Sequence, residues 1–377
     1  MTQMAERAVT DRAPAAMIAG AIPLIDVAGH LGGDAGSSRE AAAQLRWAFE
    51  NVGFYYLSGH GVPQSLIDRT YDAAARFHAQ PMAAKLALKV NKHNIGYLPI
   101  SDAASPQTAA RGRKPSQNEA YFLRRERAPN DPEVIANRRF HGLNQWPDDL
   151  PGFRETTLEY IRTLEALCRR LVPLYALALD LPADFFDACF AEPHMILRMS
   201  RYPIIDGEDE TVASLVPHTD SGFMTLLPPN RVPGLSILLP SGRWIDAPGI
   251  DGAYVVNGGD ILHRWTNERF LSTPHRVRNI SSQVRYAIPF FCDPDHDTAI
   301  ECLPSCRSGD NPAKYPPIRF GDYAPVVCQQ ELSAHGERAG PARRRRLTRR
   351  PRYGALVNPT LWPEKTLLRH PCRGAAA

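Results

Sequence analysis

A histidine, an aspartate and a second histidine carry the strongest chemical signal in this sequence. His218 and Asp220 lie two residues apart in the stretch VPHTD, and His275 follows 55 residues after Asp220 in STPHRV. Side chains two apart on a strand point to the same face, so the first pair could share one metal ion. Two imidazoles and one carboxylate leave half of an octahedral coordination shell open, as in non-haem Fe(II) oxygenases. The open positions would accept a chelating cosubstrate and O2.

Arg285 adds a second element to this pattern. It lies ten residues after His275 and opens the stretch RYAIPFF. A guanidinium near the open side of a metal ion would bind a distal carboxylate in bidentate fashion. A single H-x-D motif is a weak signal, because most histidines in a β-rich protein are core or turn residues. The combination of H-x-D, a later strand histidine and an arginine is much more specific.

Two kinds of segment must position these residues. Apolar spacing and capping residues predict helices over 37–54, 63–77 and 152–181, with Gly53 ending the first helix. We expect the longest helix to be broken or bent at Pro173. From Met195 onwards, short apolar runs alternate with proline and glycine turns, which is typical of an antiparallel sandwich or barrel. The predicted fold class is therefore α+β.

The composition is that of a soluble globular protein. Of 377 residues, 44% are apolar and 22% are charged. No uncharged apolar stretch reaches the roughly 18 residues that a membrane span needs. The segment APAAMIAGAIPLI (13–25) is interpreted as an arm entering the first strand rather than a signal peptide. Seven scattered cysteines indicate a reducing, cytoplasmic location without a disulfide framework, and Cys302 and Cys306 lack the partner pair of a zinc site.

The basic charge of the chain is concentrated at its C-terminal end. Residues 331–377 contain 11 Lys/Arg and 3 Asp/Glu, a surplus of +8 that leaves residues 1–330 at −4. The stretch PARRRRLTRRPRYG could be a nucleic-acid or anionic-surface patch. We favour a disordered tail or one read in a shifted frame, because its composition changes abruptly to Arg, Pro, Gly and Ala. Nucleic-acid binding is expected only if this tail is functional.

Ordered motifs from about Ala21 to Val327 resemble the isopenicillin N synthase-like 2-oxoglutarate/Fe(II)-dependent dioxygenase family. They include WAFENVGFYYLSGHGVP, NQWPDDLPGFR, HTDSGFMTLL, VVNGGDIL and STPHRV. The resemblance implies a double-stranded β-helix (jelly-roll) core with a helical N-terminal region packed around it. The implied division is a flexible arm at 1–20, an N-terminal dioxygenase region at 21–130, connecting helices at 131–194, the β-core at 195–297, a C-terminal segment at 298–330 and the tail at 331–377.

The resemblance also implies roles for individual residues. His218, Asp220 and His275 match the iron ligands of the family. Arg285 matches the arginine that binds the 2-oxoglutarate carboxylate, and Tyr202 matches a tyrosine that hydrogen-bonds the same cosubstrate. The implied reaction uses Fe(II), 2-oxoglutarate and O2, with ascorbate as a candidate reductant. It oxidises an unactivated C–H bond of a small molecule and releases succinate and CO2.

Ala287 departs from the family pattern, which is usually Arg-x-Ser where this chain has Arg-Tyr-Ala. Losing that hydroxyl removes one hydrogen bond to a carboxylate, worth roughly 1.5–3 kcal/mol. The loss corresponds to up to about two decades in affinity. Relatives that form ethylene and succinate from 2-oxoglutarate, with arginine, also have a small residue there. Three alternatives therefore stay open: an ethylene-forming enzyme, a 2-oxoglutarate-independent oxidase of the same fold, and a metal-binding module without catalysis, which an open coordination face disfavours.

Other residues of reactive types are interpreted as structural. His60 in SGHGV lies between two glycines that indicate a tight bend. Asp260 in NGGDIL is interpreted as a turn or strand-entry carboxylate. His263 and Trp265 are placed on the surface or in the core, with a role in the substrate pocket as the alternative. The residues expected to pack the barrel are Phe290 and Phe291.

Two arginines and two loops remain for substrate recognition. Arg198 and Arg201 are placed on a solvated strand face, and contact between one of them and substrate is the alternative. The loops expected to line the pocket are 91–125 and 205–216. Nothing in the sequence identifies the substrate itself.

Overall fold

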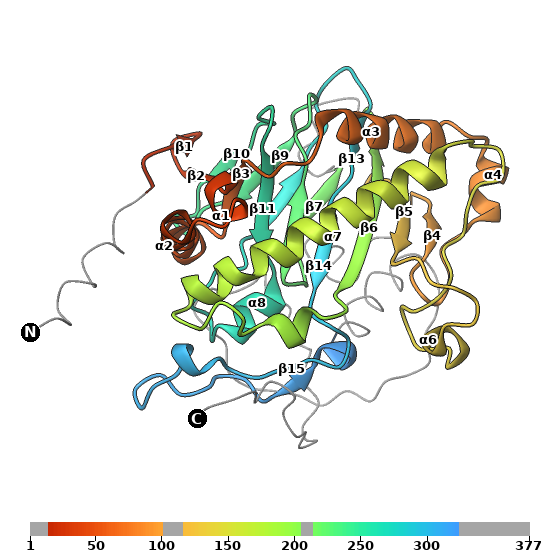
Figure 1. Cartoon of the computed structure of the whole chain (residues 1–377). Coiled ribbons are helices and arrows are strands. Elements are labelled where there is room, and N and C mark those ends of the chain that lie inside the picture. Colours follow the sequence, from red (N-terminus) through yellow and green to blue (C-terminus); the bar gives the residue numbers. More distant parts are fainter. Residues whose placement is uncertain (1–13, 101–115, 205–213, 324–377) are drawn as a thin grey trace, which may run out of the picture.

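The computed structural model of the protein describes residues 14–100, 116–204 and 214–323. Two facing sheets form a sandwich, and helices cover the outer face of the larger sheet (Figure 1). The predicted α+β class is confirmed. Most of the predicted arm, part of the predicted pocket loop 91–125, most of the predicted loop 205–216 and the whole tail lie outside the described residues. The predicted domain boundaries stay a prediction.

The N-terminal half supplies most of the helices and the edge strands of the large sheet. Its strands are β1 Met17–Ile18, β2 Ile22–Asp26, β3 Phe54–Ser58, β4 Gly96–Leu98 and β5 Glu119–Arg124. Its helices are α1 Ala28–Leu31, α2 Ala35–Asn51, α3 Gln64–His78, α4 Met82–Ala87, α6 Pro132–Ile135 and α7 Phe153–Ala178.

The C-terminal half supplies the strands of the sandwich. They are β6 His194–Tyr202, β7 Leu215–His218, β8 Met224–Leu227, β9 Leu235–Leu238, β10 Trp244–Asp246, β11 Tyr254–Gly258, β12 His275–Val277, β13 Arg285–Ala287, β14 Phe290–Asp293, β15 Ala299–Ile300 and β16 Ile318–Arg319. The helical elements among them are the 3-10 turn Asp187–Phe190, α8 Asp260–Trp265 and the 3-10 turn Pro304–Cys306.

The two sheets differ in strand number and in what packs against them. The ten-stranded sheet runs β1-β2-β3-β11-β8-β14-β6-β5-β4, with β13 also paired to β6. The four-stranded sheet runs β10-β9-β12-β7. One apolar cluster joins the large sheet to α2, α3 and α7, and a second cluster fills the space between the sheets. The large sheet is thus buried on both faces, whereas the small sheet closes one side of an interior.

Strand β6 shows how alternation divides these two environments. Met195, Leu197 and Met199 lie in the cluster under the helices. Tyr202 belongs to the cluster between the sheets. Because successive strand residues point to opposite faces, Arg198 and Ser200 share the interior face with Tyr202. The Arg198 and Ser200 side chains therefore face the space that the two sheets enclose.

The predicted helices are present, with one correction. The helix predicted over 37–54 is α2, where the Asp34 side chain accepts a hydrogen bond from the Ser37 amide at 2.6 Å. Gly53 follows the helix with φ +77°, the left-handed conformation that the prediction required. The predicted break at Pro173 is wrong, because α7 is continuous from Phe153 to Ala178, and the alternative of a bend there stays a prediction. Leu171, Leu174 and Tyr175 are buried around the proline, so packing outweighs the lost hydrogen bond. No helix of the described chain is long and apolar enough to cross a membrane.

Candidate metal centre

The register of one ladder brings the two predicted histidines together. His218 ends β7 and His275 begins β12, and the two residues are direct antiparallel partners. Their ring centroids lie 4.3 Å apart. Asp220 lies just beyond the end of β7, so the prediction that it shares a strand with His218 is wrong. The turn nevertheless directs its carboxylate to both rings.

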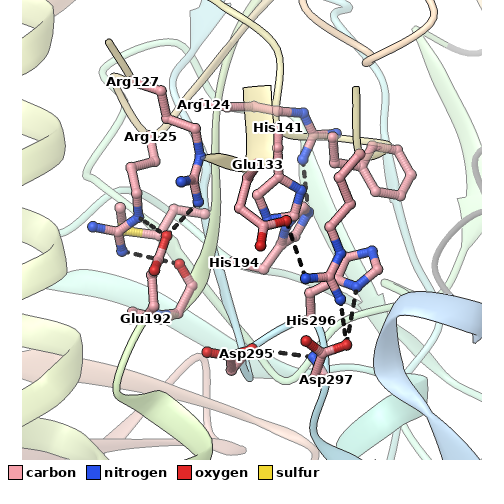
Figure 2. Close-up of a pocket in the computed structure, with 14 residues that line it drawn as sticks. Arg124, Arg125, Arg127, Glu133, His141, Glu192, His194, Asp295, His296 and Asp297 are labelled. Atoms are coloured by element: carbon pink, nitrogen blue, oxygen red, sulfur yellow. Dashed lines mark hydrogen bonds and ion pairs between the residues drawn. The ribbon is translucent and has the colours of Figure 1, made fainter. Parts of the chain in front are cut away.

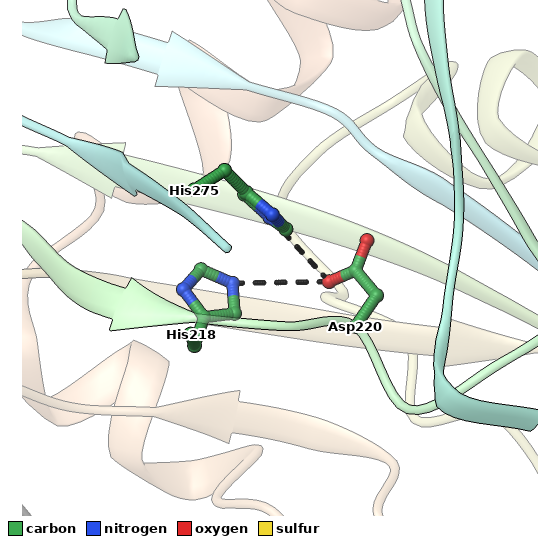
Figure 3. Close-up of side chains that lie close together, drawn as sticks. All are labelled: His218, Asp220 and His275. Carbon is green, nitrogen blue, oxygen red and sulfur yellow. Dashed lines mark ion pairs between the residues drawn. The ribbon is translucent and has the colours of Figure 1, made fainter. Parts of the chain in front are cut away.

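The three side chains converge on one point (Figure 3). Nε2 of His218 and Nε2 of His275 each lie 3.7 Å from Oδ1 of Asp220. One ligand atom from each residue lies within 4.8 Å of the other two, and the described chain contains no other such group of His, Cys, Asp or Glu side chains. Donors at these separations can all reach a single ion, because metal–ligand bonds are roughly 2 Å long.

Backbone carbonyls fix the tautomers of both imidazoles. Nδ1 of His218 lies 2.9 Å from the Val216 oxygen, and Nδ1 of His275 lies 3.2 Å from the Thr273 oxygen. A carbonyl only accepts, so each Nδ1 carries the proton and each Nε2 presents a lone pair. Burial, and then the neighbouring His275, lower the pKa of His218 to about 4. The ring is therefore neutral near pH 7, as a metal ligand must be.

Two further side chains orient the Asp220 carboxylate. Its Oδ2 accepts hydrogen bonds from Thr225 Oγ1 and Asn257 Nδ2, both at 2.7 Å. Oδ1 is left to face the histidines. Burial alone would raise the pKa of Asp220, but His275, His218 and these hydrogen bonds lower it, so the carboxylate stays ionised. Two neutral imidazoles and one oriented carboxylate fit the donor set of a facial Fe(II) site.

Sequence reasoning missed Thr225 and Asn257. Both are polar residues inside otherwise apolar strand runs, FMTLL and VVNGG. They are Cα partners across the β8–β11 ladder. A polar residue in a buried strand was the available signal, because it requires a partner.

Arg285 and Tyr202 form a second pair across a ladder. They are Cα partners on β13 and β6, and the guanidinium carbon lies 5.2 Å from the tyrosine ring centroid. Arg285 is only 2% exposed, and its Nε donates to the Val232 oxygen at 3.2 Å. Its buried Nη1 has no hydrogen-bond partner, and no carboxylate of the described residues pairs with it. A buried cation of this kind requires an anionic ligand, which fits the distal carboxylate of 2-oxoglutarate.

The other candidate residues of the sequence analysis make structural contacts. The His60 ring accepts a hydrogen bond from the Val62 amide at 3.0 Å, within the predicted bend. Asp260 begins α8 and accepts from Ser272 Oγ at 2.6 Å. Nδ1 of His263 lies 2.6 Å from a backbone oxygen, that of Phe270. Trp265 is buried in the helix-side cluster.

The predictions for four residues on the barrel strands have mixed outcomes. Phe290 is buried in the helix-side cluster, but half-buried Phe291 is the Cα partner of Thr225, which bonds Asp220. Phe291 therefore lies on the metal side of the sheet. The arginines do not occupy a solvated face. Arg201 pairs with buried Glu119 at 2.8 Å, and Arg198 faces the interior. The positive charge of Arg198 is a small contribution to the lowered pKa of His218, after burial and His275.

A separate polar pocket of about 130 Å³ lies at the His194 end of β6 (Figure 2). Arginines and histidines line it, and three of the arginines, Arg125, Arg127 and Arg138, have acidic partners. Arg125 pairs with Glu165 at 2.9 Å, and Arg138 pairs with Glu133 at 3.1 Å. The pocket therefore contains a network of ion pairs. Its histidines are His141, His194 and His296.

Comparison with known proteins agrees with this geometry. A family model described as the non-haem dioxygenase in morphine synthesis N-terminal matches residues 22–149. A model of the 2OG-Fe(II) oxygenase superfamily matches residues 191–294, which contain all five predicted site residues. The 2-oxoglutarate-Fe(II) type oxidoreductase hxnY of Emericella nidulans is 36% identical over 309 residues, covering 80% of this chain and 87% of that protein. The chain belongs to the 2OG-Fe(II) oxygenase superfamily.

Further relatives of this oxygenase have diverse small substrates or products in their names. Kihadalactone A synthase LFS of Citrus sinensis is 35% identical, covering 75% of this chain and 86% of that protein. A full-length Neurospora crassa protein, solved in complex with alpha-KG and thymine, has a TM-score of 0.73 and 29% identity, covering 83% of this chain and 97% of that one. A 2OG-Fe(II) oxygenase family protein of Caulobacter crescentus has a TM-score of 0.71 and 29% identity, covering 83% and 98%. The predicted jelly-roll fold and 2-oxoglutarate-dependent, non-haem iron dioxygenase class are confirmed.

Proposed function

We propose that His218, Asp220 and His275 hold the Fe(II) of this dioxygenase, and that Arg285 and Tyr202 bind the distal carboxylate of 2-oxoglutarate. The convergence of two Nε2 atoms on Oδ1 of Asp220, each at 3.7 Å, carries the proposal. Bound Fe(II) and 2-oxoglutarate supply the oxidising chemistry, in which O2 converts the cosubstrate to succinate and CO2 while a substrate C–H bond is oxidised.

The chain supplies orientation and charge. The Val216 and Thr273 carbonyls hold the two imidazoles in the ligating tautomer. Arg285 neutralises the charge of the cosubstrate carboxylate in a buried position that water does not reach. Phe291 and Ile196, partners on the interior face of β14 and β6, form an apolar wall beside the Asp220 support. Such a wall keeps water from the reacting centre.

We further propose that the substrate carries an anionic group that Arg198 binds. A divalent cation, the Asp220 carboxylate, the 2-oxoglutarate dianion and Arg285 together have zero net charge. Arg198 then adds one positive charge to the same space between the two sheets. Its only hydrogen bond within the described residues runs from Nη2 to Asn118 Oδ1 at 3.0 Å, and its buried Nε has no partner. A half-buried guanidinium that has no counter-charge among the described residues favours a carboxylate or similar anion.

One anaerobic titration tests the metal and cosubstrate assignments together. Purified protein receives Fe(II) and then 2-oxoglutarate, while the visible metal-to-ligand charge-transfer band is recorded. We expect a band with one-to-one stoichiometry that requires both additions. Iron binding without any band would contradict the cosubstrate assignment. Substrate oxidation that is independent of 2-oxoglutarate would support the oxidase alternative instead.

Ethylene formation is a second candidate, and Ala287 is the observation that favours it. The small side chain is 3% exposed and lies on the same strand as Arg285. Headspace gas analysis of the iron-loaded protein with 2-oxoglutarate, with and without L-arginine, tests it. Ethylene above a sample without iron would support this outcome, and succinate without ethylene would exclude it.

We also infer that the protein works in a reducing, cytoplasmic environment. The cysteines of the described chain are free and buried, at positions 168, 189, 292, 302 and 306. Free thiols in this number are typical of reducing compartments. Fractionation of the producing cells with an antibody against the protein would test the location.

A further inference from the structure

Ser200 carries an unusual buried hydroxyl beside the Arg285 pair. The residue is 0% exposed, and its Oγ has no hydrogen-bond partner within the described chain. Most buried hydroxyls in folded proteins are paired, because an unpaired one loses its bonds to water without replacement. An unpaired hydroxyl therefore suggests a missing ligand.

The β6–β13 ladder places Ser200 directly opposite Ala287. Arg285 pairs with Tyr202, and Ala287 pairs with Ser200, in consecutive rungs on the same face. Opposed residues on one face have Cβ atoms only about 5 Å apart. Ser200 thus occupies the volume next to the position where the family usually has the serine of Arg-x-Ser.

The ladder neighbours of Ser200 are small and apolar. On the β5 side its Cα partner is Ala120, and on the β13 side it is Ala287. Neither alanine side chain can accept a hydrogen bond from the hydroxyl. The nearest rung of the same face contains Arg285, whose Nη1 is also buried and unpaired. Two buried donors without a partner in the described chain, one charged and one neutral, therefore lie on the same face of one ladder.

We propose that Ser200 donates a hydrogen bond to the distal carboxylate of 2-oxoglutarate, in place of the hydroxyl that Ala287 lacks. This inference rests on the proposed role of Arg285 in binding that carboxylate. A carboxylate has two oxygens, so one can accept from the guanidinium and the other from the hydroxyl. The loss predicted from Ala287 is then compensated from the opposite strand.

Anaerobic charge-transfer titration with 2-oxoglutarate tests Ser200→Ala against the wild-type protein. We expect the dissociation constant to rise at least about tenfold, since one hydrogen bond to an ionised group is lost. Fe(II) affinity should not change. Without 2-oxoglutarate the variant should melt at the same or a higher temperature, because it no longer buries an unpaired hydroxyl.

The double variant Ser200→Ala/Ala287→Ser provides the matched control. A serine at 287 should restore 2-oxoglutarate binding to within about threefold of wild type, because it presents a hydroxyl from the facing rung. Thr70→Ala, which removes a buried hydroxyl that bonds within α3, should leave 2-oxoglutarate affinity unchanged. An unchanged dissociation constant in Ser200→Ala, or a double variant as weak as the single one, would overturn the inference. A wild-type protein without any charge-transfer band would instead refute the proposed cosubstrate site itself.

Discussion

His218 and His275 face each other as Cα partners across the β7–β12 ladder, with ring centroids 4.3 Å apart. β12 also pairs with β9, whereas β7 is an edge strand of its sheet. A metal ion shared by the two rings would therefore tie an edge strand to its neighbour. Metal binding and the order of this sheet edge should be linked.

Asp220→Ala should abolish stoichiometric Fe(II) binding, because two imidazoles alone hold a divalent ion poorly. We expect affinity to fall by at least about 100-fold. Metal content after gel filtration measures the loss. Asp246→Asn is the matched control, since Asp246 lies on the same small sheet and accepts a hydrogen bond from Ser236 at 2.8 Å. Equal iron loss in both variants would contradict the assignment of Asp220.

Thr225→Val and Asn257→Leu should each weaken Fe(II) binding without removing a ligand. Each variant removes one hydrogen bond of 2.7 Å to Oδ2 of Asp220, so the carboxylate loses its fixed orientation. Loss of a residue that hydrogen-bonds a metal ligand in this way typically lowers metal affinity by about 10–100-fold. Competition with a coloured chelator measures the change. Wild-type affinity in both variants would show that the Asp220 orientation does not depend on them.

Arg285→Gln should raise the dissociation constant for 2-oxoglutarate by about 100-fold or more, because it removes the buried positive charge. Fe(II) binding should stay unchanged, since Arg285 contacts none of the three metal ligands. The charge-transfer titration separates the two effects. Arg201→Gln serves as the control, because Arg201 pairs with Glu119 on the opposite face of the sheet. An unchanged affinity for 2-oxoglutarate in Arg285→Gln would show that Arg285 does not bind the cosubstrate.

Arg198→Gln should selectively weaken the binding of anionic substrates. Benzoate, phenylacetate and hexanoate, compared with their primary amides, provide probes that can perturb the charge-transfer band of the loaded protein. We expect at least one carboxylate to bind about tenfold more tightly than its amide, and the preference to vanish in Arg198→Gln. Affinity for 2-oxoglutarate should not change. A change in 2-oxoglutarate affinity would assign Arg198 to the cosubstrate, and no carboxylate preference in the wild type would refute an anionic substrate.

Gly53→Ala should destabilise the protein and the metal site together. Gly53 has φ +77°, and an added Cβ would lie 2.1 Å from Oγ1 of Thr273. The Thr273 carbonyl accepts a hydrogen bond from Nδ1 of His275. A displacement of Thr273 would therefore also move this metal ligand. We expect a loss of about 2–4 kcal/mol in the free energy of unfolding, measured by urea denaturation. Gly33→Ala, with φ +87° and no neighbour within 4 Å, should cost only about 1–2 kcal/mol. Similar costs at both positions would show that the Thr273 contact is unimportant.

The sequence by itself determined the chemistry and the kinds of elements. His218, Asp220, His275 and Arg285 stand out because metal and carboxylate binding require particular residue types. The α2 helix and its end at Gly53 follow from local rules, since periodicity and backbone conformation depend on neighbouring residues. Family motifs then ordered these local signals into one fold.

Only the tertiary structure decided which side chains meet. The register of β7 with β12, and of β6 with β13, sets His218 against His275 and Ser200 against Ala287. Packing around Pro173 kept α7 continuous against its local preference. The assignment of Arg198 to the interior and Arg201 to Glu119 likewise depends on strands distant in sequence. Long-range strand pairing is decided by the burial of whole faces, so no local stretch of sequence specifies it.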